Sequence, residues 1–138
     1  GGNEKIVVVE SGIDALSYAQ LHGRDATVVS LGGSRREIPA MLHDALRSGR
    51  VKELIVAVDN DATGRKMSER LVESARALFD RMVRSIRAVF PTAKDWNDDL
   101  KAAQARQSVF DRARAARTAP RAVPAASEPE NGWTPPRP

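Results

Sequence analysis

The 138-residue chain contains no cysteine. Disulfides, a cysteine nucleophile and a zinc site with cysteine ligands are therefore excluded within it. It also lacks any apolar run of the roughly 18 residues that a membrane-spanning helix needs, and its start lacks the charged and then apolar pattern of a signal peptide. We therefore expect a cytoplasmic protein that makes no use of a membrane.

Most of the chain has no excess of positive charge. Residues 1–99 hold 15 Lys/Arg and 15 Asp/Glu, whereas residues 100–138 hold 7 and 3. The net charge of +4 therefore comes entirely from the C-terminal end. A neutral core argues against a basic surface that grips duplex DNA through its phosphates across the whole fold. A role with nucleic acid must be argued from a specific site.

The length and the hydrophobic content of 41% suit one domain with a true core, and hardly two. Gly1 and Gly2 stand almost against the first strand pattern. We interpret the chain as a piece of a larger protein, whose other domains flank it.

Short apolar runs that alternate with helical patterns predict the fold. The predicted strands are residues 5–10, 26–31, 53–59 and 85–90. Apolar residues at helical spacing follow the first three, over residues 13–22, from about 38 to 46, and 62–82. Residues 34–37 have the spacing of a capping box, although Pro39 favours a later start for the second helix. This order predicts an α/β fold with a mainly parallel four-stranded sheet and helices on both faces.

The C-terminal end differs in composition from the rest. An Ala/Arg/Gln-rich stretch beyond Lys101 extends a helix to about Arg117. From Thr118 on, proline, alanine, serine and glutamate prevail with few large apolar residues, which is typical of a disordered tail. We therefore divide the chain into a domain over 1–117, with its core at about 5–101, and a tail over 118–138.

Acidic residues follow three of the four predicted strands. Glu10 ends the first, Asp59 and Asp61 end the third, and the segment KDWNDD follows the fourth. Because ligands collect beyond the carboxyl ends of parallel strands, these acids should lie at one edge of the sheet. Asp59 and Asp61 would face the same side of an extended chain and hold one cation between them. Carboxylates suit Mg²⁺ or Mn²⁺.

Each acid also has a simpler interpretation. Asp61 precedes a long helix and fits its N-cap, Glu10 fits a solvated loop, and Asp95 with Asn97 fits the start of the last helix. However, carboxylates gathered at one edge repel one another unless a cation relieves them. Their coincidence therefore favours a metal site.

These residues resemble the Toprim domain of primases, topoisomerases, recombination proteins and certain nucleases, which has a Rossmann-like fold. The matching segments are VVVESGIDALS with Glu10, SLGGS with Gly32 and Gly33, and VDNDATGRK with Asp59 and Asp61. KDWNDDL is further similar to the primase-like branch found on plasmid mobilisation, conjugation and mobile-element proteins. The resemblance covers roughly residues 5–101.

The resemblance implies a set of roles. Glu10 would be a general base or acid, or a further metal ligand, while Asp59 and Asp61 would hold Mg²⁺. The remaining candidates are Asp95 and Asp98 for a second metal, Arg65, Lys66 and Lys94 for phosphates, and Gly12, Gly32, Gly33 and Gly64 for turns. A solvated charge at a helix end is as good an interpretation of each cation.

The function implied is Mg²⁺-dependent nucleotidyl transfer of the primase type, with single-stranded DNA template and nucleotides brought by the parent protein. A metal-dependent nuclease, a topoisomerase-related domain and a non-catalytic nucleic-acid or partner-binding module stay open. Tyr18, the only tyrosine, lies in a helix pattern and is a poor candidate for a topoisomerase nucleophile. His22 and His43 lack ligand spacing, and Trp96 is expected to pack in the core.

Overall fold

The computed structural model describes residues 4–32, 37–118 and 136–138. The predicted capping box at 34–37 lies mostly outside the described residues, as do Gly33 and residues 119–135 of the predicted tail. Within the described part, no helix is both long and apolar enough to cross a membrane.

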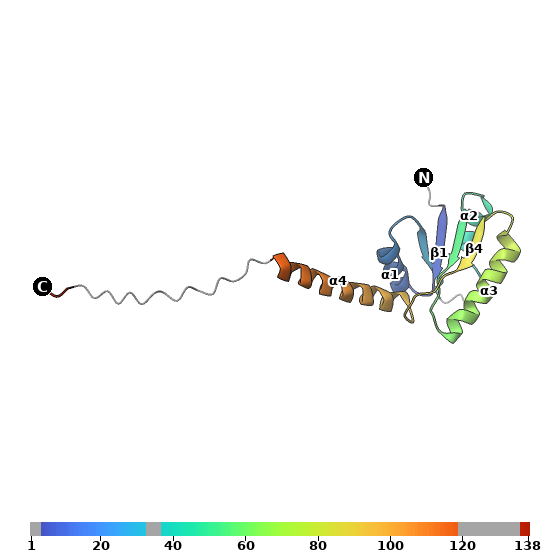
Figure 1. Ribbon diagram of the computed structural model, residues 1–138. Coiled ribbons are helices and arrows are strands. Elements are labelled where there is room, and N and C mark those ends of the chain that lie inside the picture. Colours follow the sequence, from blue (N-terminus) through green and yellow to red (C-terminus); the bar gives the residue numbers. More distant parts are fainter. Residues whose placement is uncertain (1–3, 33–36, 119–135) are drawn as a thin grey trace. The chain divides into compact units, whose positions relative to one another are not determined.

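Four parallel strands form one sheet in the order β2-β1-β3-β4 (Figure 1). They are β1 (Lys5–Val9), β2 (Thr27–Ser30), β3 (Glu53–Val56) and β4 (Ser85–Ala88). In the register, Val7 lies between Val28 of β2 and Ile55 of β3. β1 and β3 are central, and their continuous β-branched and apolar sequences are typical of strands that are covered on both faces. The predicted parallel α/β fold is confirmed.

Helices cover both faces of the sheet, as Figure 1 shows for α1 and α3. The helices are α1 (Gly12–His22), α2 (His43–Arg47), α3 (Ala62–Phe79) and α4 (Trp96–Thr118), with a 3₁₀ turn, η1 (Ala40–Leu42), before α2. On one face Val8 packs in a cluster with Leu71 and Phe79 of α3. On the other, Val9 packs with Tyr18 of α1 and with Trp96. Because side chains alternate along a strand, neighbouring valines of β1 serve opposite cores.

Two predicted helices end or begin at other residues than expected. The helix predicted from about residue 38 is a single 3₁₀ turn followed by the five residues of α2, and Pro39 stands at the N-cap of that turn. α3 ends at Phe79 and not at Met82. After Phe79 the chain forms a turn in which the N–H groups of Met82 and Val83 both donate to the Phe79 carbonyl (2.9 Å each), and Val83 is buried while Met82 is exposed.

The chain divides into two compact units, Gly1–Ala105 and Arg106–Pro138. Every residue of the candidate site described below belongs to the first unit. The domain boundary that we place after residue 117 stays a prediction.

Candidate metal centre

Glu10 and Asp59 lie together at the carboxyl edge of the sheet. Glu10 directly follows β1, and Asp59 comes three residues after β3, the neighbouring strand. The Ala57 N–H donates to the Val8 carbonyl (2.8 Å), which keeps the loop after β3 beside β1. The Asp59 backbone N–H then donates to Oε1 of Glu10 (3.4 Å). The parallel pairing of two central strands thus places two acidic residues side by side.

The Asp59 carboxyl group is poorly solvated. Its Oδ1 is buried and, within the described part of the chain, accepts no hydrogen bond. Burial, together with the nearby acids Glu10, Asp14 and Asp95, raises the pKa of Asp59 to about 7. A buried carboxylate normally needs a partner of opposite charge or a hydrogen-bond donor. A bound cation would supply that partner, so the Glu10 and Asp59 pair fits a hard divalent metal.

Asp61 is the N-cap of α3. Its Oδ1 accepts a hydrogen bond from the Gly64 N–H (2.6 Å), which satisfies one of the free donors in the first helical turn. Helix capping, the simpler interpretation of Asp61, therefore accounts for one of its two carboxylate oxygens. Within the described ranges, no group of three His, Cys, Asp or Glu side chains is arranged to hold a metal ion. The predicted ligand set of Glu10, Asp59 and Asp61 stays a prediction.

The predicted turn glycines have different surroundings. Gly64 lies in the first turn of α3, and a Cβ there would overlap the Asp59 carbonyl oxygen and come within 2.9 Å of its carbon. Only glycine therefore lets α3 begin so close to Asp59. Gly32 follows β2 with φ of +57°, in the left-handed region that favours glycine. Gly12 begins α1, and a Cβ there would meet nothing within 4 Å.

Asp14 is a neighbour of the site that our sequence analysis missed. It lies in the first turn of α1, is only 5% exposed, and accepts a hydrogen bond at Oδ2 from the Ser11 hydroxyl (2.8 Å). The Ser11 hydroxyl also accepts from the Asp14 N–H (3.2 Å). The Ser-x-x-Asp spacing indicates a cap, but a helix that begins right after Glu10 also brings its first turn to the same edge.

The segment KDWNDD comprises the end of the loop before α4 and the first residues of that helix. Asp95 accepts at Oδ1 from the Asp98 N–H (2.8 Å), as a helix cap does, and its charge is one of those that raise the pKa of Asp59. Asp98 is exposed. Asp99, to which the sequence analysis assigned no role of its own, accepts from the backbone N–H groups of Thr92 and Ala93 (2.8 and 2.6 Å). Asp95 thus lies near the acid pair, while Asp99 holds the loop in shape.

Two of the cations predicted to meet phosphate flank this loop. The exposed Lys94 accepts at its carbonyl from the Asn60 N–H (2.6 Å), which joins the loop before α4 to the one that carries Asp59. Arg65 donates from Nε and from one terminal nitrogen to Oδ1 of Asn60 (3.1 and 2.8 Å), and it lies over the Phe90 ring at 5.8 Å. Lys66 is exposed on α3.

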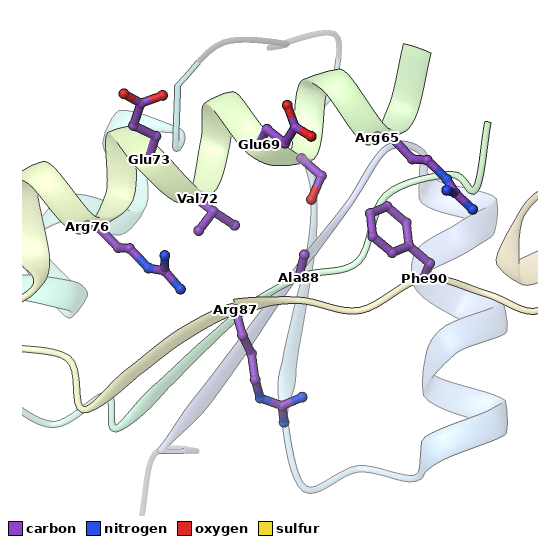
Figure 2. A pocket seen from close by; sticks show the side chains of 9 residues that line it. Arg65, Glu69, Val72, Glu73, Arg76, Arg87, Ala88 and Phe90 are labelled. Carbon is purple, nitrogen blue, oxygen red and sulfur yellow. The ribbon is translucent and has the colours of Figure 1, made fainter. Parts of the chain in front are cut away.

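A cavity of about 590 Å³ lies between α3 and β4, the edge strand (Figure 2). Arg65 and Phe90 lie at one end of it, and Arg76 lies farther along α3. Arg76 donates to the carbonyl of Ile86 (3.0 Å). Arg65 therefore connects the loop of the acid pair to this cavity, and its role toward phosphate stays a prediction.

Tyr18 and Trp96 pack in the core on one face of the sheet, and Phe79 packs in the core on the other. Tyr18 is 6% exposed, stacks on His22 with ring centroids 4.1 Å apart, and meets the edge of Trp96. Burial raises the pKa of Tyr18. Trp96 is 3% exposed and donates from Nε1 to the Ala57 carbonyl (2.7 Å). His43 is half-buried and lies 5.2 Å from the Phe79 ring. This packing removes Tyr18 from the candidate nucleophiles, since its ring belongs to the core.

The fold is that of a Toprim-like domain. Residues 7–100 match the Toprim-like family, and the chain belongs to that family. No curated protein matches the chain. Toprim domains generally use divalent metals.

Among solved structures, the chain is similar to DNA primase domains. The primase fragment of the bacteriophage T7 primase-helicase protein is 26% identical with a TM-score of 0.53, over 79% of this chain and 44% of that one. A second match is the structure of the bacteriophage T7 lagging-strand DNA polymerase interacting with primase domains of two gp4 subunits bound to an RNA/DNA hybrid and dTTP. It is 25% identical with a TM-score of 0.50, over 79% of this chain and 53% of that one. A DNA primase domain from Pseudomonas aeruginosa shares the fold. It is 24% identical with a TM-score of 0.52, over 78% of this chain and 32% of that one. The chain thus spans about half or less of these chains.

Proposed function

We propose that this chain is the metal-binding catalytic domain of a primase-type nucleotidyltransferase. The observation that carries the proposal is the pair Glu10 and Asp59, in which a buried carboxylate oxygen has no hydrogen-bond donor and the pKa of Asp59 is raised to about 7. Such a pair is unfavourable by itself and is relieved by a divalent cation. The similarity to primase domains of phage and bacterial origin supports the same function.

In this proposal Asp59 and Asp61 hold Mg²⁺ or Mn²⁺, and Asp61 contributes the oxygen that does not cap α3. A bound divalent cation would neutralise phosphate charge and orient the attacking hydroxyl. Glu10, beside Asp59, would accept the proton of that hydroxyl or complete the ligand set. Asp95 is close enough to influence Asp59 and is the better placed of the two candidates for a second metal, since Asp98 is exposed.

The cations around the acid pair would position the phosphates. Lys94 and Lys66 are exposed, and Arg65 is already oriented by Asn60. An oriented guanidinium binds phosphate with less loss of side-chain freedom than a free one. We therefore expect Arg65 to contribute more to phosphate binding than Lys66.

We further propose that the parent protein supplies the single-stranded template, the nucleotides and the flanking domains, and that it works inside the cell in plasmid or mobile-element DNA processing. The finer assignment rests on the segment KDWNDDL. A relaxase domain in the parent sequence would support plasmid transfer, and a zinc-ribbon region beside a polymerase-type region would support a replicative primase.

The metal site is tested by titrating Mn²⁺ into the chain while amide NMR signals are recorded. We expect broadening centred on residues 10–12 and 59–64, and weak affinity, because few protein oxygens leave much of the coordination shell to water. Broadening centred on the exposed acid Asp111 instead would contradict the assignment.

The chemistry is tested on the parent protein with single-stranded DNA. Primer formation that requires nucleoside triphosphates would support the proposal. Cleavage without nucleotides would indicate a nuclease, strand passage a topoisomerase-related enzyme, and metal binding without any reaction a non-catalytic module.

A further inference from the structure

The helix α4 continues well beyond the residues that match the Toprim-like family. The match ends at residue 100, whereas α4 ends at Thr118. From residue 104 to residue 118 every side chain is exposed, including Val109 (64%) and Phe110 (61%). A helix without packed contacts is only marginally stable in water. The Phe110 ring on this helix is accessible to a ligand.

Four residues in the second unit share one face of α4. Arg106, Phe110, Arg114 and Arg117 follow one another at steps of four, four and three. At about 100° per residue they fall within a sector of about 80°. Within the described part of the chain, the three arginine side chains make no ion pair or hydrogen bond. We call this set the arginine face.

Side chains on the other side of α4 form hydrogen bonds with one another. Gln107 donates to Asp111 (2.9 Å), and Arg112 donates to Ser108 (3.2 Å). Arg112 lies about 160° from the middle of the arginine face, by the same helical geometry. Cations near a helix C-terminus also interact favourably with the helix dipole, which accounts for Arg117. That effect is confined to the last turn and explains neither Arg106 nor the exposed Phe110.

We propose that the arginine face binds single-stranded nucleic acid. Arginines neutralise phosphates, and an aromatic ring between them can stack on a base, which is the combination that single-stranded binding surfaces use. A single strand is favoured over a duplex because stacking on Phe110 requires a base that is not stacked on its neighbours. Residues 1–99 carry no net charge, so the chain's excess of positive charge, which attracts nucleic acid, lies at this end.

The inference rests on the proposed function for its biological sense, but its test needs no catalysis. Binding of the 138-residue chain to a fluorescent 20-residue oligothymidylate is followed by anisotropy in EDTA, between 50 and 200 mM NaCl. Without metal, the result is independent of the acid pair. A failed metal titration and a failed binding assay are therefore distinguishable.

Replacing Arg106, Arg114 and Arg117 together by glutamine should reduce the slope of log K against log salt by about 2, because each phosphate that an arginine neutralises on a single strand contributes about 0.7 to that slope. Arg114→Gln alone should reduce it by about 0.7. Arg112→Gln removes the same charge from the other side of the helix and should leave the slope unchanged. Equal effects of Arg114→Gln and Arg112→Gln would overturn the proposal, since they would show attraction by overall charge alone.

Phe110→Ala should weaken binding about tenfold at every salt concentration, because the ring on which one base stacks is removed. Val109→Ala, at the adjacent exposed position, should have no effect. Circular dichroism checks that the variants keep the helical content of the chain. Absence of binding at 50 mM NaCl, or a concentration-dependent dimer that Phe110→Ala dissociates while DNA binding is unchanged, would overturn the proposal.

Discussion

Asp59 is stabilised as a neutral acid in the folded, metal-free chain. Burial and three nearby acids raise its pKa to about 7, against about 3.9 for an unperturbed aspartate. Between these values the folded chain holds a proton that the unfolded chain has released. The free energy of unfolding therefore falls as the pH rises from about 4 to about 7, and the loss is complete above that range.

We expect Asp59→Asn to raise the melting temperature at pH 8 in EDTA, because asparagine has the same shape without the charge. The difference from the unmodified chain should shrink toward pH 4.5, where Asp59 is protonated. Thermal unfolding at pH 4.5, 6 and 8 measures it. Asp98→Asn, which removes an exposed acid, should show no difference in melting temperature that increases with pH. Added Mg²⁺ should stabilise the unmodified chain at pH 8 but not Asp59→Asn.

Gly64 is constrained by the close approach of the Asp59 carbonyl. We expect Gly64→Ala to lower the free energy of unfolding by about 1–3 kcal/mol, as forced overpacking does, and to abolish the stabilisation by Mg²⁺. The control is Gly12→Ala, where an added Cβ meets nothing within 4 Å and φ is not positive. Urea unfolding of both variants measures the difference. A Gly64→Ala chain as stable as Gly12→Ala would show that α3 can shift freely away from Asp59.

At the scale of elements, Asp61 caps the start of α3, and in our proposal it also binds the metal. Its Oδ1 caps the helix, and the proposal assigns its other oxygen to the metal. We expect Asp61→Ala to destabilise the chain by about 1 kcal/mol, because the cap is lost. Asp61→Asn should keep the cap and the stability within a few tenths of a kcal/mol, yet weaken Mn²⁺ binding as much as Asp61→Ala does.

Urea unfolding and Mn²⁺ titration of Asp61→Ala and Asp61→Asn separate helix capping from metal binding. Equal destabilisation by both substitutions would argue against the cap. Equal metal affinity of Asp61→Asn and the unmodified chain would remove Asp61 from the ligand set.

The strands were predictable because each is a short, mostly apolar run. β1 and β3 are buried, whereas the edge strands β2 and β4 are partly exposed. The parallel order of the strands followed from the helices between them. The edge shared by Glu10 and Asp59 was predictable for the same reason. Asp14 and Asp99 were not, because their positions depend on how the first turn of α1 and the loop before α4 pack. Their spacing in the sequence indicates only that both are acids in the first turn of a helix.

At the scale of the whole molecule, the site has two acids side by side but little that would hold a template. The first 99 residues carry no net charge, and the chain spans about half or less of the primase chains it resembles. Primer synthesis also requires a template in register and two nucleotides aligned for attack. Such positioning is worth about 7–11 kcal/mol of the activation barrier.

We therefore expect the 138-residue chain alone to bind metal but to form almost no primers. In the parent protein, Asp59→Asn should abolish primer formation while leaving the fold and most template binding intact, since it removes a charge at the sheet edge and no core volume. Tyr18→Phe should have little effect, because Tyr18 is a core residue. Primer formation on single-stranded DNA by the parent and these variants measures both. Near-normal synthesis by Asp59→Asn would contradict the mechanism, and complete loss with Tyr18→Phe would support a tyrosine nucleophile and hence a topoisomerase-type reaction.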